Sequence, residues 1–211
     1  MMCSKYGTES MNQPDEQLPP QKFVSLSAQL MASLRALEST RSDCLFSDPF
    51  AAQLAGSEAF AFLERRKVKL EEEGRAYVAV RTRFFDDFLL DSMSWASQVV
   101  ILAAGMDMRA FRLPWLEGTK VYEIDQPQVL NYKNTILKNI TPTCQRYTLS
   151  ADLTKQWHEQ LLDAGFRSEF PSIWLLEGLL MYLREQEVHE LLKTISSLAM
   201  AQSCLGLEAV T

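Results

Sequence analysis

The stretch "VVILAAGMDMRAFRLP", residues 99–114, predicts the first strand of an α/β sheet and the turn that follows it. Six apolar residues run into a single glycine, Gly105, and an aspartate, Asp107, follows two positions later. A buried strand that ends in a glycine is typical of a sheet that holds a ligand over the strand tip. A phosphate at this turn would favour more glycines and no acid. The stretch therefore predicts a ligand other than a pyrophosphate.

The rest of the chain alternates short β-rich runs with helical patterns. Three helical patterns come first, at 22–39, 47–55 and 71–91. The β-rich runs cover 98–104, 119–125, 144–150, 171–177 and 203–210, with helical stretches near 126–138, 154–164 and 184–200. Alternation at this spacing favours βαβ units, so we expect an α/β fold with a doubly wound, mainly parallel sheet. The chain stops just after the fifth run, so we expect its C-terminal strands to be missing.

Composition excludes several classes of function. The chain has 211 residues, 47% of them hydrophobic and 23% charged, and a net charge of −6, which disfavours nucleic acid and anionic membranes as partners. No apolar run is long enough to span a bilayer, and the N-terminus lacks the apolar core of a signal peptide. The cysteines are scattered, without metal-ligand spacing, at Cys3, Cys44, Cys144 and Cys204. We expect a cytoplasmic protein without a metal site.

Four successive predicted strands each carry an acid at or just past the carboxyl end. Each acid alone could be a helix cap, but four at one rim repel one another unless a ligand or cation compensates them. Asp125 follows Gly105 by 20 positions, where nucleotide-binding folds hold the two ribose hydroxyls, although Glu123 lies on the same side of that strand. The four are Asp107, Asp125, Asp152 and Glu177.

These features together predict a nucleoside with a positively charged end. S-adenosylmethionine fits this description, because it carries a sulfonium, an ammonium and only one negative group. NAD fits less well, because its phosphates would meet a single glycine and Asp107 at the first turn.

The helix predicted at 71–91 offers a cation for the one negative group of that ligand. Tyr77, Val80, Phe84 and Phe88 form a narrow apolar stripe at helical spacing, and Arg81 lies beside its centre. An arginine on an apolar face requires an anion. The alternatives are that Arg81 extends to solvent or pairs with a structural acid.

Several segments match one family in the correct order. They are "LFSDPFA", "RTRFFDDFLLD", "VVILAAGMDMRAFRLP", "VYEIDQPQVLNYK", "SADL" and "WLLEGLLMYL". Over roughly residues 24–211 the chain resembles the S-adenosylmethionine-dependent methyltransferases of the leucine carboxyl methyltransferase group, above all its bacterial branch. The resemblance implies a class I methyltransferase fold, which is Rossmann-like, with a helical N-terminal lid. The expected organisation is a flexible leader over 1–21, the lid over 22–92 and an incomplete cofactor-binding domain over 93–211.

The resemblance also implies roles for single residues. Arg81 would hold the methionine carboxylate, Asp125 the ribose hydroxyls and Glu177 the methionine end. Gly105 would line the first turn, beside Asp107, and Asp152 with Leu153 would frame the adenine. Tyr182 is expected either in the acceptor pocket or as a core aromatic, and Arg35 either helps to close the site or is a plain surface arginine. The chain departs from the family at Ala103 and Met108, where a glycine and a threonine are usual.

Three functions follow as hypotheses. The first is O-methylation of a carboxylate or other acidic oxygen on a small molecule or a peptide. This acceptor needs no general base, and the two histidines, His158 and His189, are expected on the surface. The second is a catalytically inactive cofactor-binding module, suggested by Ala103 and the early end of the chain. The third is a nicotinamide-dependent oxidoreductase. No catalytic residue is assigned, and the acceptor and the oligomeric state stay open.

Overall fold

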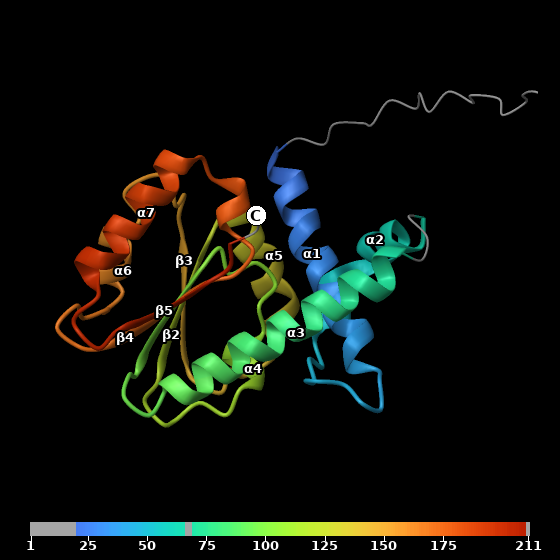
Figure 1. The fold of residues 1–211 in the computed structure, drawn as a ribbon, viewed down its shortest axis with the longest axis horizontal. Coiled ribbons are helices and arrows are strands. Elements are labelled where there is room, and N and C mark those ends of the chain that lie inside the picture. The colour runs from blue at the N-terminus through green and yellow to red at the C-terminus, as the bar shows by residue number, and fades with distance from the viewer. Residues whose placement is uncertain (1–19, 66–68, 210–211) are drawn as a thin grey trace, which may run out of the picture.

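Five parallel strands form the centre of the molecule (Figure 1). The computed structural model describes residues 20–65 and 69–209, so all but the last two residues of the predicted leader lie outside the described part. The strands are β1 (Gln98–Leu102), β2 (Lys120–Asp125), β3 (Gln145–Ser150), β4 (Ser172–Leu176) and β5 (Cys204–Leu207). Their order is β3-β2-β1-β4-β5, with every pair parallel. The order reverses between β1 and β4, and this is where open α/β sheets bind their ligands.

Helices cover both faces of the sheet. The helices α1 (Pro20–Ser39), α2 (Ala51–Arg65), α3 (Lys69–Ser92) and α5 (Pro127–Leu137) lie on one side, and α6 (His158–Asp163) and α7 (Glu185–Leu198) lie on the other (Figure 1). The structure adds two short elements that the sequence did not predict, α4 (Arg109–Arg112) and the 3₁₀ turn η1 (Leu180–Tyr182). The predicted α/β fold with a doubly wound parallel sheet is confirmed.

The central strand β1 shows why the sheet takes helices on both faces. All five of its residues are buried. Val99 and Ile101 pack into the core beneath α1, α2, α3 and α5, whereas Val100 and Leu102 pack into the core beneath α6 and α7. A strand that is apolar on both faces can be stable only between two layers. The continuous apolar run in the sequence therefore determined the three-layer arrangement.

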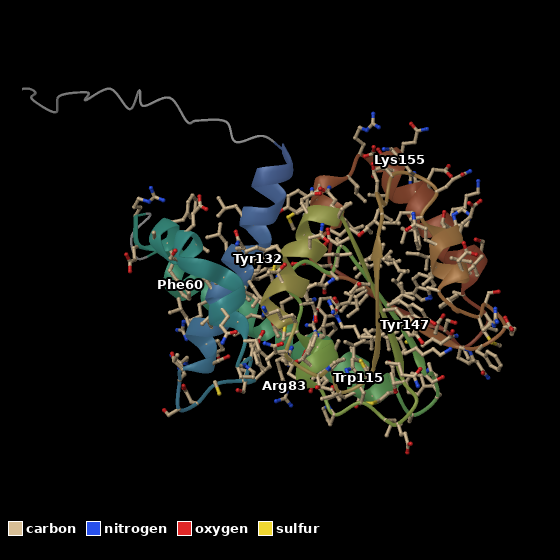
Figure 2. The ribbon with its side chains drawn as sticks, turned by 180° about the vertical axis from the view of Figure 1, so that it is seen from behind. Phe60, Arg83, Trp115, Tyr132, Tyr147 and Lys155 are labelled. Atoms are coloured by element: carbon tan, nitrogen blue, oxygen red, sulfur yellow. The ribbon has the colours of Figure 1, made fainter. Side chains whose placement is uncertain are left out.

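The helix α5 connects the N-terminal helices to the sheet. Tyr132 of α5 extends toward them, and its hydroxyl donates a hydrogen bond to the Leu54 carbonyl of α2 at 3.1 Å (Figure 2). Arg35 of α1 makes a second connection. Its Nη2 donates to the Met106 carbonyl in the turn after β1 at 2.6 Å, and its Nε lies 3.0 Å from Asp48. The expectation that Arg35 is a plain surface arginine is wrong, because the residue is only 9% exposed.

Only one residue of the apolar stripe predicted on α3 packs against the core. Phe88 does so, whereas Tyr77, Val80 and Phe84 are 51%, 61% and 63% exposed, and Val78 and Phe85 are buried instead. The buried face is rotated by about one residue from the stripe. It includes two polar residues, Thr82 and Asp86. Arg81 lies at the boundary between the exposed stripe and the buried face. Hydrophobic spacing alone selected the wrong face of this helix.

A buried ion pair fixes α5 on β2. Glu123 and Lys133 are both fully buried, and the Lys133 ammonium lies 2.8 Å from the Glu123 carboxylate. Arg146 of β3 lies 2.6 Å from the same carboxylate oxygen. Glu123 therefore pairs with structural cations and does not line the cavity at the carboxyl ends of the strands. Glu123 is thus no alternative to Asp125 as the acid expected to bind the ribose hydroxyls.

We expect Lys133→Met to lower the free energy of unfolding by about 3 kcal/mol, because it leaves the buried Glu123 carboxylate with Arg146 alone. Urea unfolding followed by circular dichroism would measure the change. The matched control is Lys138→Met, at an exposed position just after the same helix, with an expected change below about 0.5 kcal/mol. Equal effects of the two substitutions would contradict the prediction.

Candidate functional site

A cavity of about 570 Å³ opens at the carboxyl ends of the strands. The walls come from the turns after the strands, from α1 and α3, and from η1. The structure brings together every residue that the sequence and the family resemblance proposed for the site. Those lining the cavity are Arg81, Gly105, Asp107, Asp125, Asp152, Leu153, Glu177 and Tyr182.

Asp125 is fixed at the end of β2 by two backbone donors. The Gly105 N–H donates to its Oδ2 and the Gln126 N–H donates to its Oδ1, both at 2.6 Å. Burial raises the pKa of this carboxyl above its usual value, although the two N–H donors act in the opposite direction. Each oxygen keeps a second lone pair, so the carboxylate can still accept a hydrogen bond from each of two neighbouring hydroxyls.

The turn between β1 and Asp107 has a backbone that favours glycine. Ala103 has a φ of 52° and Gly105 a φ of 47°, both in the left-handed region. An L-residue there costs roughly 1–2 kcal/mol. Gly105 is free of this cost, whereas Ala103 is not. The strand predicted to reach residue 104 ends at Leu102, immediately before this change of direction.

Arg109 is the main site residue that the sequence did not predict. It is 2% exposed, and its guanidinium contacts carboxylates of Asp86, Asp107 and Glu177, with distances of 2.7 Å to Asp86 and to Glu177. Although burial raises the pKa of Asp107, the positive charge of Arg109 holds that pKa at about 2. Asp107 is therefore ionised and already paired. Two signals could have revealed Arg109: its position two residues after a strand-tip acid, and the acid Asp86 on the buried face of α3.

Arg81 pairs with two acids at the same rim. Its Nε lies 2.8 Å from Glu177, and its Nη1 donates to both carboxylate oxygens of Glu208 at 3.1 Å. The Nε–H donor is buried and has no hydrogen-bond acceptor among the described residues, because the Glu177 oxygen is close but out of line. Glu208 follows β5 directly. The sequence did not indicate this fifth strand-tip acid, because the predicted strand, 203–210, included it.

Charges of both signs meet in the lining of the cavity. Four arginines and four acids line it. Two further acids, Asp86 and Glu208, do not line the cavity but pair with lining arginines. A site of this kind favours a ligand that itself carries charges of both signs. The lining arginines are Arg35, Arg81, Arg109 and Arg112, and the lining acids are Asp107, Asp125, Asp152 and Glu177.

The three other lining residues that the sequence proposed, Asp152, Leu153 and Tyr182, are only partly buried or exposed. Asp152 accepts hydrogen bonds from the backbone N–H and the hydroxyl of Thr154, and the hydroxyl bond is the main reason that the pKa of Asp152 is lowered. Leu153 packs against the core beneath α6 and α7. Tyr182 is 46% exposed, so it is not the core aromatic that the sequence allowed as an alternative.

Other features of the described residues bear on the chemistry. Neither His158 nor His189 lines the cavity. Within residues 20–65 and 69–209, no three or more His, Cys, Asp or Glu side chains are grouped so that they could hold a metal ion. In the same part of the chain, no helix combines the length and the apolar character needed to cross a membrane.

Comparison with known proteins identifies the family. The family model for leucine carboxyl methyltransferase matches residues 28–196. A protein of Parafrankia sp. (strain EAN1pec) named "Putative S-adenosyl-L-methionine-dependent methyltransferase" is 43% identical over 194 residues. The match covers 88% of this chain and 63% of that protein. A protein of the same name from Mycobacterium marinum (strain ATCC BAA-535 / M) is 40% identical over 198 residues, with 88% and 66% covered. The chain thus spans slightly less than two thirds of the length of these relatives.

A solved structure supports the fold independently. The crystal structure of a duf574 family protein from Streptomyces avermitilis superposes with a TM-score of 0.55 at 14% identity. The superposition covers 85% of this chain and 66% of that one. At this identity the likeness concerns the fold alone. The family match over most of the chain, together with relatives at about 40% identity, shows that this protein belongs to the leucine carboxyl methyltransferase family.

Proposed function

We propose that this protein transfers the methyl group of S-adenosylmethionine to a carboxylate or other acidic oxygen of a small molecule or a peptide. One observation carries the proposal: the residues expected to bind the cofactor all line one cavity, where Asp107, Asp125 and Glu177 lie with Arg81. A volume of about 570 Å³ lies within the usual range of small-molecule sites. S-adenosylmethionine carries a sulfonium, an ammonium and one carboxylate, and a lining with charges of both signs complements these groups.

The contacts in the cavity support a distinct role for each part of the site. Asp125 would accept the two ribose hydroxyls, because its carboxylate is fixed by backbone donors and keeps two lone pairs. Gly105 lets the backbone approach the cofactor closely, and Asp152 with Leu153 would frame the adenine. Arg81 would bind the methionine carboxylate through Nη2, because its Nη1 donates to Glu208 and its Nε lies 2.8 Å from Glu177. Glu177 and Asp107 would face the cationic end. The donors and acceptors present therefore fit this cofactor.

The chain would contribute alignment and exclusion of water. When bound, the cofactor supplies a methyl group activated by the sulfonium. Residues of α1 and α3, which form the proposed lid over 22–92, cover the strand tips and would hold the acceptor against this methyl in a site shielded from solvent. An ionised carboxylate needs no base, which agrees with the absence of histidine from the described lining. Tyr182 and Met181, which line the cavity and are partly open to solvent, would contact the acceptor.

One feature favours the second candidate, a cofactor-binding module without turnover. Ala103 holds a left-handed backbone that suits glycine. The nicotinamide alternative receives no support from the family match.

The cysteines Cys44, Cys144 and Cys204 are free thiols, which supports the expected cytoplasmic location.

The activity itself has a direct test. The full chain incubated with S-adenosylmethionine and a panel of small carboxylic acids and peptides should yield methyl esters, detected by mass spectrometry as products one methylene heavier. Binding of the cofactor by calorimetry without any methylated product would favour the inactive module. Failure to bind either S-adenosylmethionine or S-adenosylhomocysteine would contradict both.

The ionisation of Asp125 predicts how cofactor affinity depends on pH. The pKa of this carboxyl is raised, so as the pH falls the carboxylate becomes protonated earlier than an exposed aspartate would. Because the neutral acid is a weaker acceptor for the ribose hydroxyls, affinity for S-adenosylhomocysteine should fall as the pH is lowered, at a higher pH than for a site with an exposed aspartate. Asp125→Asn should bind about ten- to a hundredfold more weakly at neutral pH and show no such pH dependence. Asp163→Asn, an exposed control, should match the unmodified protein. A wild-type pH profile retained in Asp125→Asn would contradict the role of Asp125.

The left-handed backbone of Ala103 predicts a stabilising substitution. Ala103→Gly removes a strain of roughly 1–2 kcal/mol, and the greater freedom of glycine in the unfolded chain offsets part of it. We expect stability to rise by up to about 1 kcal/mol and affinity for S-adenosylhomocysteine to increase. Ala104→Gly is the control, since Ala104 is not among the positive-φ residues, and it should destabilise the protein. The measurements are thermal unfolding and calorimetry. An Ala103→Gly variant that is less stable than the unmodified protein would show that the turn is not strained.

A further inference from the structure

Glu208 makes a dense set of contacts at the end of β5. Its side chain is 8% exposed. It accepts hydrogen bonds from Nη1 of Arg81, at 3.1 Å to both oxygens, and from the Gly178 N–H at 2.7 Å. The Tyr77 hydroxyl donates to it as well. One carboxylate therefore joins the lid helix α3 to the turns after β4 and β5.

Glu208 lies behind Arg81 as seen from the cavity. Arg81, Tyr77 and Gly178 line the cavity, whereas Glu208 is not among the lining residues. A guanidinium has five N–H donors in a fixed fork, of which Glu208 uses those on Nη1, and Nε lies 2.8 Å from Glu177. Nη2 makes no hydrogen bond to a described residue and is left for a ligand. Arg81 could bind a carboxylate in the cavity while it keeps its contact with Glu208.

The surroundings of Arg81 restrict its orientation. The Tyr77 ring lies with its centre 5.4 Å from the Arg81 guanidinium carbon, and the Tyr77 hydroxyl bonds to Glu208. Gly178 has a φ of 65°, and a Cβ there would lie 3.8 Å from both Arg81 Nη1 and a Glu208 oxygen, so the backbone passes close to the pair. A long, flexible side chain is held here from several sides, which reduces the entropy lost when it binds a ligand.

We propose that Glu208 is a positioning residue that orients Arg81 toward the carboxylate of the cofactor. It does not touch the cofactor itself and acts through Arg81. This inference rests on the proposed function, because Arg81 needs a carboxylate-bearing ligand. A competing role has the opposite consequence: if Glu208 instead occupied Arg81 in place of the ligand carboxylate, its removal would free the guanidinium and strengthen binding.

Calorimetry with two ligands tests the positioning role on the full chain. S-adenosylhomocysteine carries the amino-acid group, and 5′-methylthioadenosine lacks it. Glu208→Gln should weaken binding of S-adenosylhomocysteine about tenfold, which corresponds to about 1.4 kcal/mol, and change binding of 5′-methylthioadenosine less than twofold. Glu117→Gln, at an exposed position far along the chain, is the matched control and should leave both affinities unchanged.

A double-mutant cycle shows whether the effect passes through Arg81. In an Arg81→Met background, Glu208→Gln should cause no further loss of S-adenosylhomocysteine affinity. Tighter binding by Glu208→Gln would overturn the proposal in favour of competition. An equal loss for both ligands would show a general structural effect, and no loss would show that Glu208 has no role in binding. If the unmodified protein binds neither ligand, the proposed function itself fails, whereas the other outcomes leave it intact.

Discussion

The guanidinium of Arg109 connects three parts of the chain that are distant in sequence. It binds Asp86 from α3, Asp107 from the turn after β1 and Glu177 from the end of β4, and its Nη2 donates to the Thr82 carbonyl. Because the group is almost fully buried, its charge must be compensated by carboxylates in fixed positions. This requirement places α3 against the strand tips. Without Arg109, three carboxylates would repel one another at the centre of the site.

The same network determines the charge that a ligand meets. Arg109 neutralises part of the acidic rim, and Arg81 and Arg112 neutralise a further part. The lining of the cavity thus presents charges of both signs. A cofactor that is a cation overall, but carries one carboxylate, is suited to a rim of this kind because Arg81 offers a donor within an acidic surrounding. Free phosphates would meet Asp107 and Asp125 instead.

The turn after β1 combines a hydrogen bond to Asp125 with a backbone that is strained at one residue. Asp125 binds the Gly105 N–H, and this contact bends the chain across the end of β2. The bend requires left-handed backbone at two positions, of which only one is glycine. The backbone at Ala103 is therefore strained. The strain lies within the residues that line the cavity, so it bears on ligand binding as well as on stability.

The sequence by itself determined the parallel sheet, its construction from βαβ units and four of the acids at the carboxyl ends of its strands. These follow from local patterns: apolar strands, turn residues, and the rule that parallel strands end at one edge. Tertiary structure decided which charges are free and which are paired. The buried face of α3 includes the polar Thr82 and Asp86, which apolar spacing does not reveal, and the ion pairs of Arg109 and Glu208 form only where distant segments meet. A buried ion pair depends on where two segments meet in space, and the spacing of residues along one segment does not encode that meeting.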